Sequence, residues 1–307
     1  MLQELAPDCE FSIHAKEEIE EIKTKGKIWF FTQAESNEEL EELLEMGIKN
    51  FVIDNEIDLE RILKTIKKTQ IKINLSLRMK FQEHRVGSGK YFVYGMPSIK
   101  INQIIEKIKN NLNIKKLGIH IHRKSQNTSE WEIVSEIKDS LTEDTLKRIN
   151  FLNLGGGLPV KYKSYTSKIL PYIFEKIKKA EEFLDKNEIE TYIEPGRFLA
   201  APCIRLETQI IQVYEKTIVI NTTIYNTALD TVLTNTKMII EQELPEETEG
   251  DFYLIKGNSP TRDDIFRYKV KLKNPKPGDK LTFLNAGAYN YTTDFFGYKK
   301  LITEVKE

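Results

Sequence analysis

The sequence of 307 residues predicts an α/β fold, with a parallel sheet and its helices up to about residue 200 and a β-rich module beyond it. Two observations lead to this prediction. Short apolar stretches rich in β-branched and aromatic residues alternate with charged stretches of helical periodicity through the first two-thirds of the chain. After Ala200, strand-like stretches follow one another without helices between them.

Seven stretches in the first part have the apolar character of buried parallel strands. They are residues 10–15, 27–33, 50–55, 72–79, 116–122, 149–157 and 190–196. Apolar residues at helical spacing occupy residues 15–26, 36–47, 58–68, 97–111 and 167–187, and glycine closes the first two as a helix C-cap. A (β/α)8 barrel has eight strands and an open doubly wound sheet can have seven, so this count leaves both open.

The β-rich module consists of five strand-like stretches. They are residues 204–215, 216–225, 251–257, 268–274 and 280–289. A Pro-Lys-Pro-Gly-Asp-Lys segment at 275–280 marks a turn between the last two. The sequence therefore predicts two domains, residues 1–200 and residues 201–307.

Composition narrows the class of protein. Lys+Arg total 46 and Asp+Glu 47, which disfavours a general nucleic-acid or membrane-surface binder. The two cysteines, Cys9 and Cys203, cannot form a disulfide framework. The sequence lacks an apolar run of about 18 residues and a secretory signal, so we expect a soluble cytoplasmic protein without a membrane partner.

Two segments at predicted strand ends suit a phosphorylated ring. Gly155–Gly157 allow a sharp turn that points backbone N–H groups at an anion, although a tight turn without a ligand would have the same sequence. In a Glu-Pro-Gly-Arg segment with Gly196, Glu194 can accept a hydrogen bond from a protonated ring nitrogen. Arg197 can pair with a phosphate in a forked geometry, or with Glu194 in an ion pair at the rim of the sheet.

A third segment carries two histidines on one face of a strand, His120 and His122. Because no cysteine lies nearby, we expect no metal there. His122 suits stacking on a planar cofactor and Ser125 can donate to a phosphate, whereas His120 is expected to pack at the strand end.

A fourth segment, Asn-Ala-Gly-Ala-Tyr, ends at Tyr289. Its rigid aromatic ring holds a hydroxyl that can donate or accept a hydrogen bond. The alternative role for Tyr289 and for Tyr291 is in the core or an interface. For Phe295 and Phe296 the core or interface role is the one that we expect.

Together the four segments resemble the fold-type III pyridoxal-phosphate decarboxylases, which include the ornithine, diaminopimelate, lysine, arginine and carboxynorspermidine decarboxylases. The order agrees over almost the whole chain: His-x-x-Ser, Gly-Gly-Gly, Glu-Pro-Gly-Arg, then Gly-Ala-Tyr. The resemblance implies a TIM-type (β/α) barrel of the alanine-racemase kind, with its first strand missing, followed by a β-rich domain. It also implies a homodimer with shared active sites.

The resemblance implies a role for each residue. His122 would stack on the ring of pyridoxal 5'-phosphate, and Glu194 would keep the pyridine nitrogen protonated. Arg78 ends another strand and would support the cofactor face. The phosphate would be held by Ser125, Gly155, Gly156, Gly157, Arg197 and Tyr289, with Gly196 beside it.

The chain departs from the family in three places. The lysine that forms the Schiff base belongs to the first barrel strand, and this sequence begins about one helix later, so we expect that lysine to be absent from it. In the interface loop 257–264, Pro260 replaces a proton-donating cysteine and Thr261 an acidic residue, whereas Gly257 fits. Residues 221–223, Asn-Thr-Thr, lack a further carboxylate.

These departures bear on the substrate. Without the two acids, the distal cation of a simple diamino acid has no partner, and Arg262 suggests instead an anionic group such as a second carboxylate. Arg262 and Asp264 of the interface loop are the candidate catalytic residues.

The leading hypothesis is a pyridoxal-phosphate-dependent carboxy-lyase for a basic or carboxylate-bearing amino acid of a polyamine or lysine pathway. Its missing strand would come from an upstream start codon, from sequence removed by truncation, or from a separate chain. The alternative is a non-catalytic decarboxylase paralogue that binds or regulates a partner. A racemase of related fold is a third option, which Glu194 disfavours because a protonated ring nitrogen suits decarboxylation.

Overall fold

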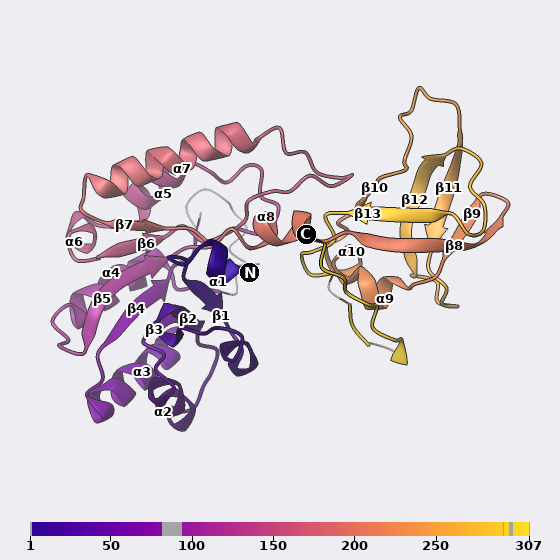
Figure 1. Ribbon diagram of the computed structural model, residues 1–307. Coiled ribbons are helices and arrows are strands. Elements are labelled where there is room, and N and C mark those ends of the chain that lie inside the picture. Colours follow the sequence, from indigo (N-terminus) through magenta and orange to yellow (C-terminus); the bar gives the residue numbers. More distant parts are fainter. Residues whose placement is uncertain (1, 82–93, 291, 295–296, 307) are drawn as a thin grey trace. The chain divides into compact units, whose positions relative to one another are not determined.

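The computed structural model describes residues 2–81, 94–290, 292–294 and 297–306, and it divides into two compact units (Figure 1). The first unit comprises Met1–Gly157 and Pro171–Glu194, and the second Leu158–Leu170 and Pro195–Glu307. The sequence placed the domain boundary near residue 200. The second unit begins six residues earlier, at Pro195, and also takes the segment that follows the three glycines.

Within the described ranges, the first unit contains a seven-stranded sheet in which all neighbours are parallel and the strand order follows the chain. Its strands are β1 (Phe11–Ile13), β2 (Ile28–Phe31), β3 (Asn50–Ile53), β4 (Ile73–Arg78), β5 (Ile114–His120), β6 (Phe151–Asn153) and β7 (Glu190–Tyr192). Sequential order is that of a (β/α) barrel, whereas a doubly wound sheet reverses its order at a switch point. The seven predicted strands and the barrel-type fold are confirmed.

Helices follow most of these strands (Figure 1). Helix α1 (Leu2–Leu5) precedes β1, and the helices that follow strands are α2 (Asn37–Glu45), α3 (Glu56–Thr69), α4 (Ser98–Ile108), α5 (Ile133–Ser140), α6 (Glu143–Leu146) and α7 (Leu170–Asp185). Helix α2 begins with a capping box, in which Ser36 accepts from the N–H of Glu39. Gly47 follows α2 with a φ of 89°, as predicted for a C-cap.

The prediction of a helix at residues 15–26 was wrong. This stretch forms two short 3-10 turns, η1 (Lys16–Ile19) and η2 (Lys25–Lys27), and Gly26 lies inside the second. The Nζ of Lys25 donates to the backbone carbonyls of Ile19 and Ile22, the latter at 2.7 Å. A side chain thus takes carbonyl groups that a continuous helix would use for its own hydrogen bonds.

The sheet of the first unit determines where its polar side chains lie. Strands β3 and β6 are buried at every residue, as in parallel sheets that are covered on both faces. Polar residues gather where strands end: Arg78 closes β4, His120 closes β5, Asn153 closes β6 and Glu194 follows β7. Because carboxyl ends of parallel strands share one edge, these side chains meet there.

The described residues of the second unit form a six-stranded sheet in the order β10-β13-β8-β9-β11-β12. Its strands are β8 (Leu206–Tyr214), β9 (Thr217–Ile220), β10 (Ile239–Ile240), β11 (Asp251–Lys256), β12 (Ile265–Leu272) and β13 (Lys280–Leu284). All neighbours are antiparallel except β9 and β11. The β-rich second part is therefore confirmed as a mixed sheet.

The second unit differs from the prediction in its helices. The segments α9 (Ile224–Thr227) and α10 (Leu229–Thr234) follow β9, where the sequence predicted a strand over residues 216–225 and no helix. Thr223 accepts from the N–H of Asn226 and so caps α9, which ends the strand early. Two further short helical segments of this unit are α8 (Gly196–Ala200) and η4 (Ala201–Cys203). Among all helices described, none has the length and apolar character needed to cross a lipid bilayer.

Candidate active site

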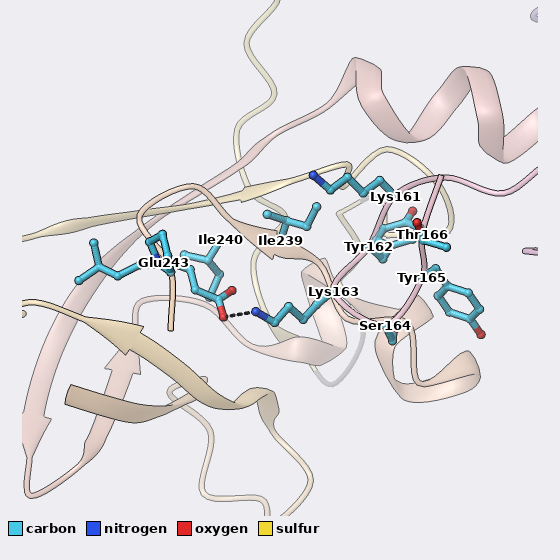
Figure 2. Close-up of a pocket in the computed structure, with 11 residues that line it drawn as sticks. Lys161, Tyr162, Lys163, Ser164, Tyr165, Thr166, Ile239, Ile240 and Glu243 are labelled. Atoms are coloured by element: carbon cyan, nitrogen blue, oxygen red, sulfur yellow. Dashed lines mark hydrogen bonds and ion pairs between the residues drawn. The ribbon is translucent and has the colours of Figure 1, made fainter. Parts of the chain in front are cut away.

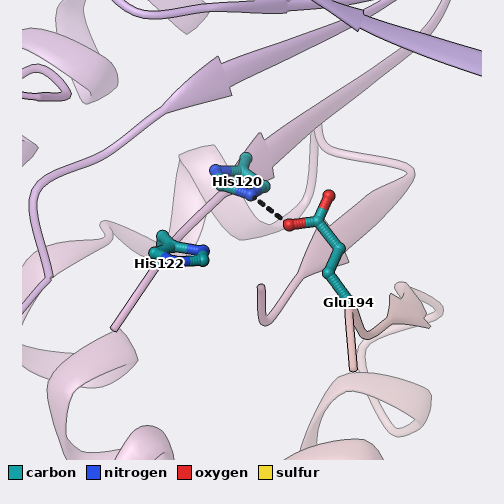
Figure 3. Close-up of side chains that lie close together, drawn as sticks. All are labelled: His120, His122 and Glu194. Atoms are coloured by element: carbon teal, nitrogen blue, oxygen red, sulfur yellow. Dashed lines mark hydrogen bonds and ion pairs between the residues drawn. The ribbon is translucent and has the colours of Figure 1, made fainter. Parts of the chain in front are cut away.

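Glu194 is the centre of a hydrogen-bond network at the carboxyl edge of the first unit's sheet. Its Oε1 accepts from Ser12 Oγ at 2.6 Å and from Asn153 Nδ2 at 3.0 Å. Its Oε2 lies 2.9 Å from His120 Nε2 (Figure 3). Its side chain is 17% exposed and that of His120 1%. Residues from β1, β5 and β6 thus hold one carboxylate that follows β7.

The same network keeps Glu194 ionised. Burial by itself would raise the pKa of this carboxyl, but the charge of His120 and the hydrogen bonds from His120 and Ser12 together lower its pKa to about 2. A carboxylate offers about four lone-pair directions, and three are used by these partners. As far as the described residues show, one acceptor position therefore remains for a donor from a ligand.

His122 lies beside this carboxylate, just beyond the end of β5. Its ring is nearly parallel to that of His120, with an interplanar angle of 15° and 6.0 Å between centroids. Its Nδ1 accepts from the N–H of Gly156 at 3.4 Å, which leaves the ring proton on Nε2. The surrounding protein removes much of the water around the ring, and this desolvation, with the charges of His120 and Arg78, lowers the pKa of His122 to about 4. His122 therefore offers a neutral, accessible aromatic face.

The ring of His120 is packed, as the sequence predicted, and it also has a polar partner. Its side chain is fully buried. The Phe31 ring packs against it edge to face, with 5.0 Å between the two ring centroids. The pair with Glu194 was not anticipated, because no spacing in the sequence links residues 74 positions apart.

His120, His122 and Glu194 also have ligand-type atoms within 4.8 Å of one another. Their geometry suits hydrogen bonding better than a metal ion. Nearly parallel imidazole rings direct their in-plane lone pairs along parallel planes instead of toward one point. The Nε2 of His120 is already committed to Glu194.

The three glycines form a turn that excludes every larger side chain. Gly155 has a φ of 66°, and an added Cβ there would lie 2.1 Å from the carbonyl oxygen of Ile121. A Cβ on Gly156 would lie 2.7 Å from the carbonyl oxygen of Glu194. The carbonyls of Gly155 and Gly157 accept from the N–H groups of Glu194 and Asn127, both at 2.9 Å. These contacts fix the turn beside the His122 ring.

The remaining predicted site residues differ in their surroundings. Ser125 lies in an exposed turn after β5, and Arg78 at the end of β4 pairs with Asp54 at 3.3 Å. Gly196 begins α8, and an added Cβ there would meet open space. Tyr291, Phe295 and Phe296 lie outside the described residues.

Arg197 is buried in the second unit against a carboxylate that sequence reasoning missed. Its Nη1 lies 2.7 Å from Asp230 Oδ2 and its Nη2 3.0 Å from Asp230 Oδ1, in a forked pair. Burial would lower the pKa of Arg197, but the hydrogen bonds with Asp230 and Tyr162 raise it above its ordinary value. The Tyr289 ring lies 4.9 Å from the guanidinium. The predicted phosphate contacts of Arg197 and Tyr289 stay predictions.

The two candidate catalytic residues of loop 257–264 differ in their surroundings. Asp264 is fully buried, and its carboxylate accepts from the N–H of Ile224 at 2.7 Å, from the N–H of Ser259 at 3.0 Å and from Ser259 Oγ at 2.6 Å. The side chain of Arg262 is 97% exposed. As folded, Asp264 holds the loop and Arg262 projects from it.

A surface pocket of about 630 Å³ lies wholly within the second unit (Figure 2). Segments 161–166 and 239–245 provide its walls, and Lys163 Nζ pairs with Glu243 Oε1 across it at 2.7 Å. It contains no residue that the sequence predicted to bind a cofactor or substrate. We therefore assign it no part in the proposed chemistry.

The fold and site define a barrel protein with an ionised carboxylate, a neutral imidazole face and a glycine turn, which together suit a phosphorylated pyridine cofactor. The family described as "Pyridoxal-dependent decarboxylase, pyridoxal binding domain" matches residues 2–201. This chain belongs to that family, and its cofactor is pyridoxal phosphate.

Individual relatives agree with this assignment. The diaminopimelate decarboxylases of Pseudomonas fluorescens and Vibrio cholerae are each 24% identical, over 92% of this chain and 71% of their own length. Among solved structures, Helicobacter pylori diaminopimelate decarboxylase with L-lysine has a TM-score of 0.80 at 21% identity, covering 98% of this chain and 79% of its own. Selenomonas ruminantium lysine decarboxylase has a TM-score of 0.81 at 16% identity, covering 97% and 80%. The structural likenesses show the fold.

The state of His122 leads to a first testable prediction. In a proton NMR titration, the imidazole resonance that disappears in His122→Gln should have a midpoint near pH 4, not near the ordinary 6.5. Between these values the unfolded chain binds a proton that the folded chain does not, so stability should decrease as the pH falls. Because the ring is partly screened by solvent, we expect a loss of about 1 kcal/mol. A midpoint near 6.5 would contradict the described surroundings of His122.

Proposed function

We propose that this protein is a pyridoxal-phosphate-dependent decarboxylase of an amino acid that carries a second carboxylate at its far end, as diaminopimelate does. The observation that carries the proposal is the anionic Glu194, which has three donors from the chain and one acceptor position left over. The relatives are decarboxylases by name, so the comparisons give the non-catalytic alternative no support.

Pyridoxal phosphate supplies an electron sink for the electron pair that remains when the bond to the departing carboxylate breaks. Glu194 would accept a hydrogen bond from the protonated ring nitrogen and so hold a proton at that atom. His122 would orient the ring by contact with its face, because a neutral imidazole adds no charge that opposes the nitrogen's proton. The turn at Gly155–Gly157 would receive the phosphate.

The substrate proposal depends on loop 257–264. Among the described residues the exposed guanidinium of Arg262 has an ion-pair contact only with Asp263, at 3.9 Å, and the hydrogen bonds of Asp264 fix the loop. We propose that this loop serves an active site of a second copy of the chain, in a homodimer with shared sites. A distal carboxylate would then meet Arg262 in a charge-assisted pair.

A diamino acid of the type used in polyamine pathways is the second candidate substrate. Its distal cation would be repelled by Arg262. The two acids that the family places there are replaced by Thr261 and by the Asn-Thr-Thr of residues 221–223. We therefore rank it below a dicarboxylate substrate.

The proposal is tested by CO2 release from meso-diaminopimelate, lysine and ornithine with the cofactor-loaded protein. We expect diaminopimelate to be preferred, and Arg262→Ala to raise its KM about tenfold or more with little change in kcat, as for loss of a charged hydrogen bond. The matched control is Arg205→Ala, which removes another exposed arginine of the second unit.

Two outcomes would count against the proposal. If Arg262→Ala changed KM no more than Arg205→Ala, Arg262 would not bind the distal carboxylate. If the protein bound pyridoxal phosphate but released CO2 from none of the three amino acids, the non-catalytic alternative would gain support.

A further inference from the structure

Arg123 is a buried arginine directly behind the glycine turn, and none of the roles described so far involves it. It is 2% exposed, and its Nη2 donates to the carbonyl oxygens of Leu154 at 2.8 Å and Gly156 at 3.3 Å. Its guanidinium carbon lies 4.1 Å from the centroid of the Trp131 ring and 5.4 Å from that of Phe81. The guanidinium is therefore held between aromatic rings and the backbone of the turn.

The hydrogen bond to Gly156 determines where the next peptide N–H points. In a planar trans peptide, the C=O of one residue and the N–H of the next point in opposite directions. Binding of the Gly156 carbonyl by Arg123 therefore turns the N–H of Gly157 away from Arg123. Among the described residues, this N–H donates to no protein group, so it is free for a ligand.

Among the described residues no acid contacts the Arg123 guanidinium directly, and Glu130 acts on it only through its charge at a distance. Within the described ranges it forms no ion pair, and its hydrogen bonds go to neutral carbonyls. Burial lowers its pKa to about 10, so it stays protonated at neutral pH. A buried cation without a carboxylate partner is costly, and an anion bound to the glycine turn would reduce that cost.

We propose that Arg123 is a positioning residue, which holds the glycine turn in its phosphate-binding form and adds positive potential behind it. This inference rests on the binding of pyridoxal phosphate at Gly155–Gly157. It predicts a specific defect in Arg123 variants. Affinity for the phosphorylated cofactor should fall, while affinity for pyridoxal, which lacks the phosphate, should be preserved.

The test compares the two ligands by isothermal titration calorimetry on wild type, Arg123→Met and Arg123→Lys. We expect Arg123→Met to bind pyridoxal phosphate about tenfold more weakly, as for loss of a charge-assisted interaction, and pyridoxal as wild type does. Arg123→Lys keeps the charge but not the forked donors. Its affinity for pyridoxal phosphate should lie between those of wild type and Arg123→Met. Lys176→Met is the control, because it removes another cation stacked on an aromatic ring of the first unit, at 5.3 Å from Tyr172.

Each outcome decides the inference. If Arg123→Met lost affinity equally for pyridoxal phosphate and pyridoxal, Arg123 would have only a packing role. If its affinity for pyridoxal phosphate were unchanged, the proposal would also be overturned. If Arg123→Met does not fold, Arg123→Lys decides by the same ratio. A wild type that binds pyridoxal phosphate no better than pyridoxal would overturn the placement of the phosphate at the turn. None of these readouts depends on CO2 release, so failure of the proposed decarboxylation would be seen separately.

Discussion

Glu194→Gln should lower CO2 release by the cofactor-loaded protein about 100- to 1000-fold, the range found when a preorganised electrostatic contact is removed from an active site. A glutamine side chain can still accept from Ser12 and Asn153, but it is uncharged and cannot hold a proton at a ring nitrogen. Its NH2 group would also face His120 Nε2, which lies 2.9 Å from Glu194 Oε2. The rate would be measured in single turnovers, so that product release does not mask the chemistry.

The matched control is Glu190→Gln, the same change at the start of strand β7. Glu190 is exposed and pairs with Lys116 at 2.9 Å, away from the carboxyl edge of the sheet, so its rate should stay close to wild type. Affinity for pyridoxal phosphate should change little in either variant, because the phosphate contacts remain. A Glu194→Gln protein that kept a rate within about threefold of wild type would show that Glu194 does not act on the ring.

Asp230→Ala should lower the free energy of unfolding by about 3–5 kcal/mol, because it leaves a buried guanidinium without its counter-ion. The side chains of Arg197 and Asp230 are 4% and 2% exposed, and two hydrogen bonds join them. The loss would be measured by urea unfolding at neutral pH. Thr234 Oγ1, which donates to Asp230 Oδ1 at 3.1 Å, would lose an acceptor as well.

Two comparisons isolate the cause of that loss. Asp251→Ala breaks an ion pair of similar length, with Lys216 at 2.9 Å, but both side chains are more than half exposed, so we expect a loss of at most about 1 kcal/mol. The double variant Arg197→Met/Asp230→Ala removes the unpaired charge and should recover part of the stability. If the double variant were less stable than Asp230→Ala alone, the buried charge would not be the cause.

Much of the fold could be predicted from the sequence because buried parallel strands leave a strong local signal. Runs such as residues 50–53, buried at every position, need no distant partner to be recognised. Residues 15–26 were mispredicted because their helical spacing competes with a tertiary interaction, the Lys25 ammonium on backbone carbonyls. The short helices after β9 depend on the Thr223 cap, which stands inside a β-branched stretch typical of strands.

The candidate site was only partly predictable for a similar reason. Gly155–Gly157, Glu194 and His122 are unusual residues at strand ends, and such residues stand out in a sequence. Ser12 and Asn153 are ordinary polar residues whose importance comes from the folded distance to Glu194. The partner of Arg197 was missed because Asp230 lies in a segment predicted to have no helix, whereas the structure places it in α10.

The hydrogen bond between Ser12 and Glu194 has a consequence for how this site comes into being. It joins residues 182 positions apart, one on the first strand of the described sheet and one just after the seventh. The carboxylate therefore has all three of these donors only when strand β1 and the residues after β7 lie close together in the folded unit. Since two of those donors help to keep it ionised, the low pKa of Glu194 depends on the tertiary fold of the first unit and not on its local sequence. The group that we expect to tune the cofactor therefore also links the first strand of the described sheet to the end of the seventh.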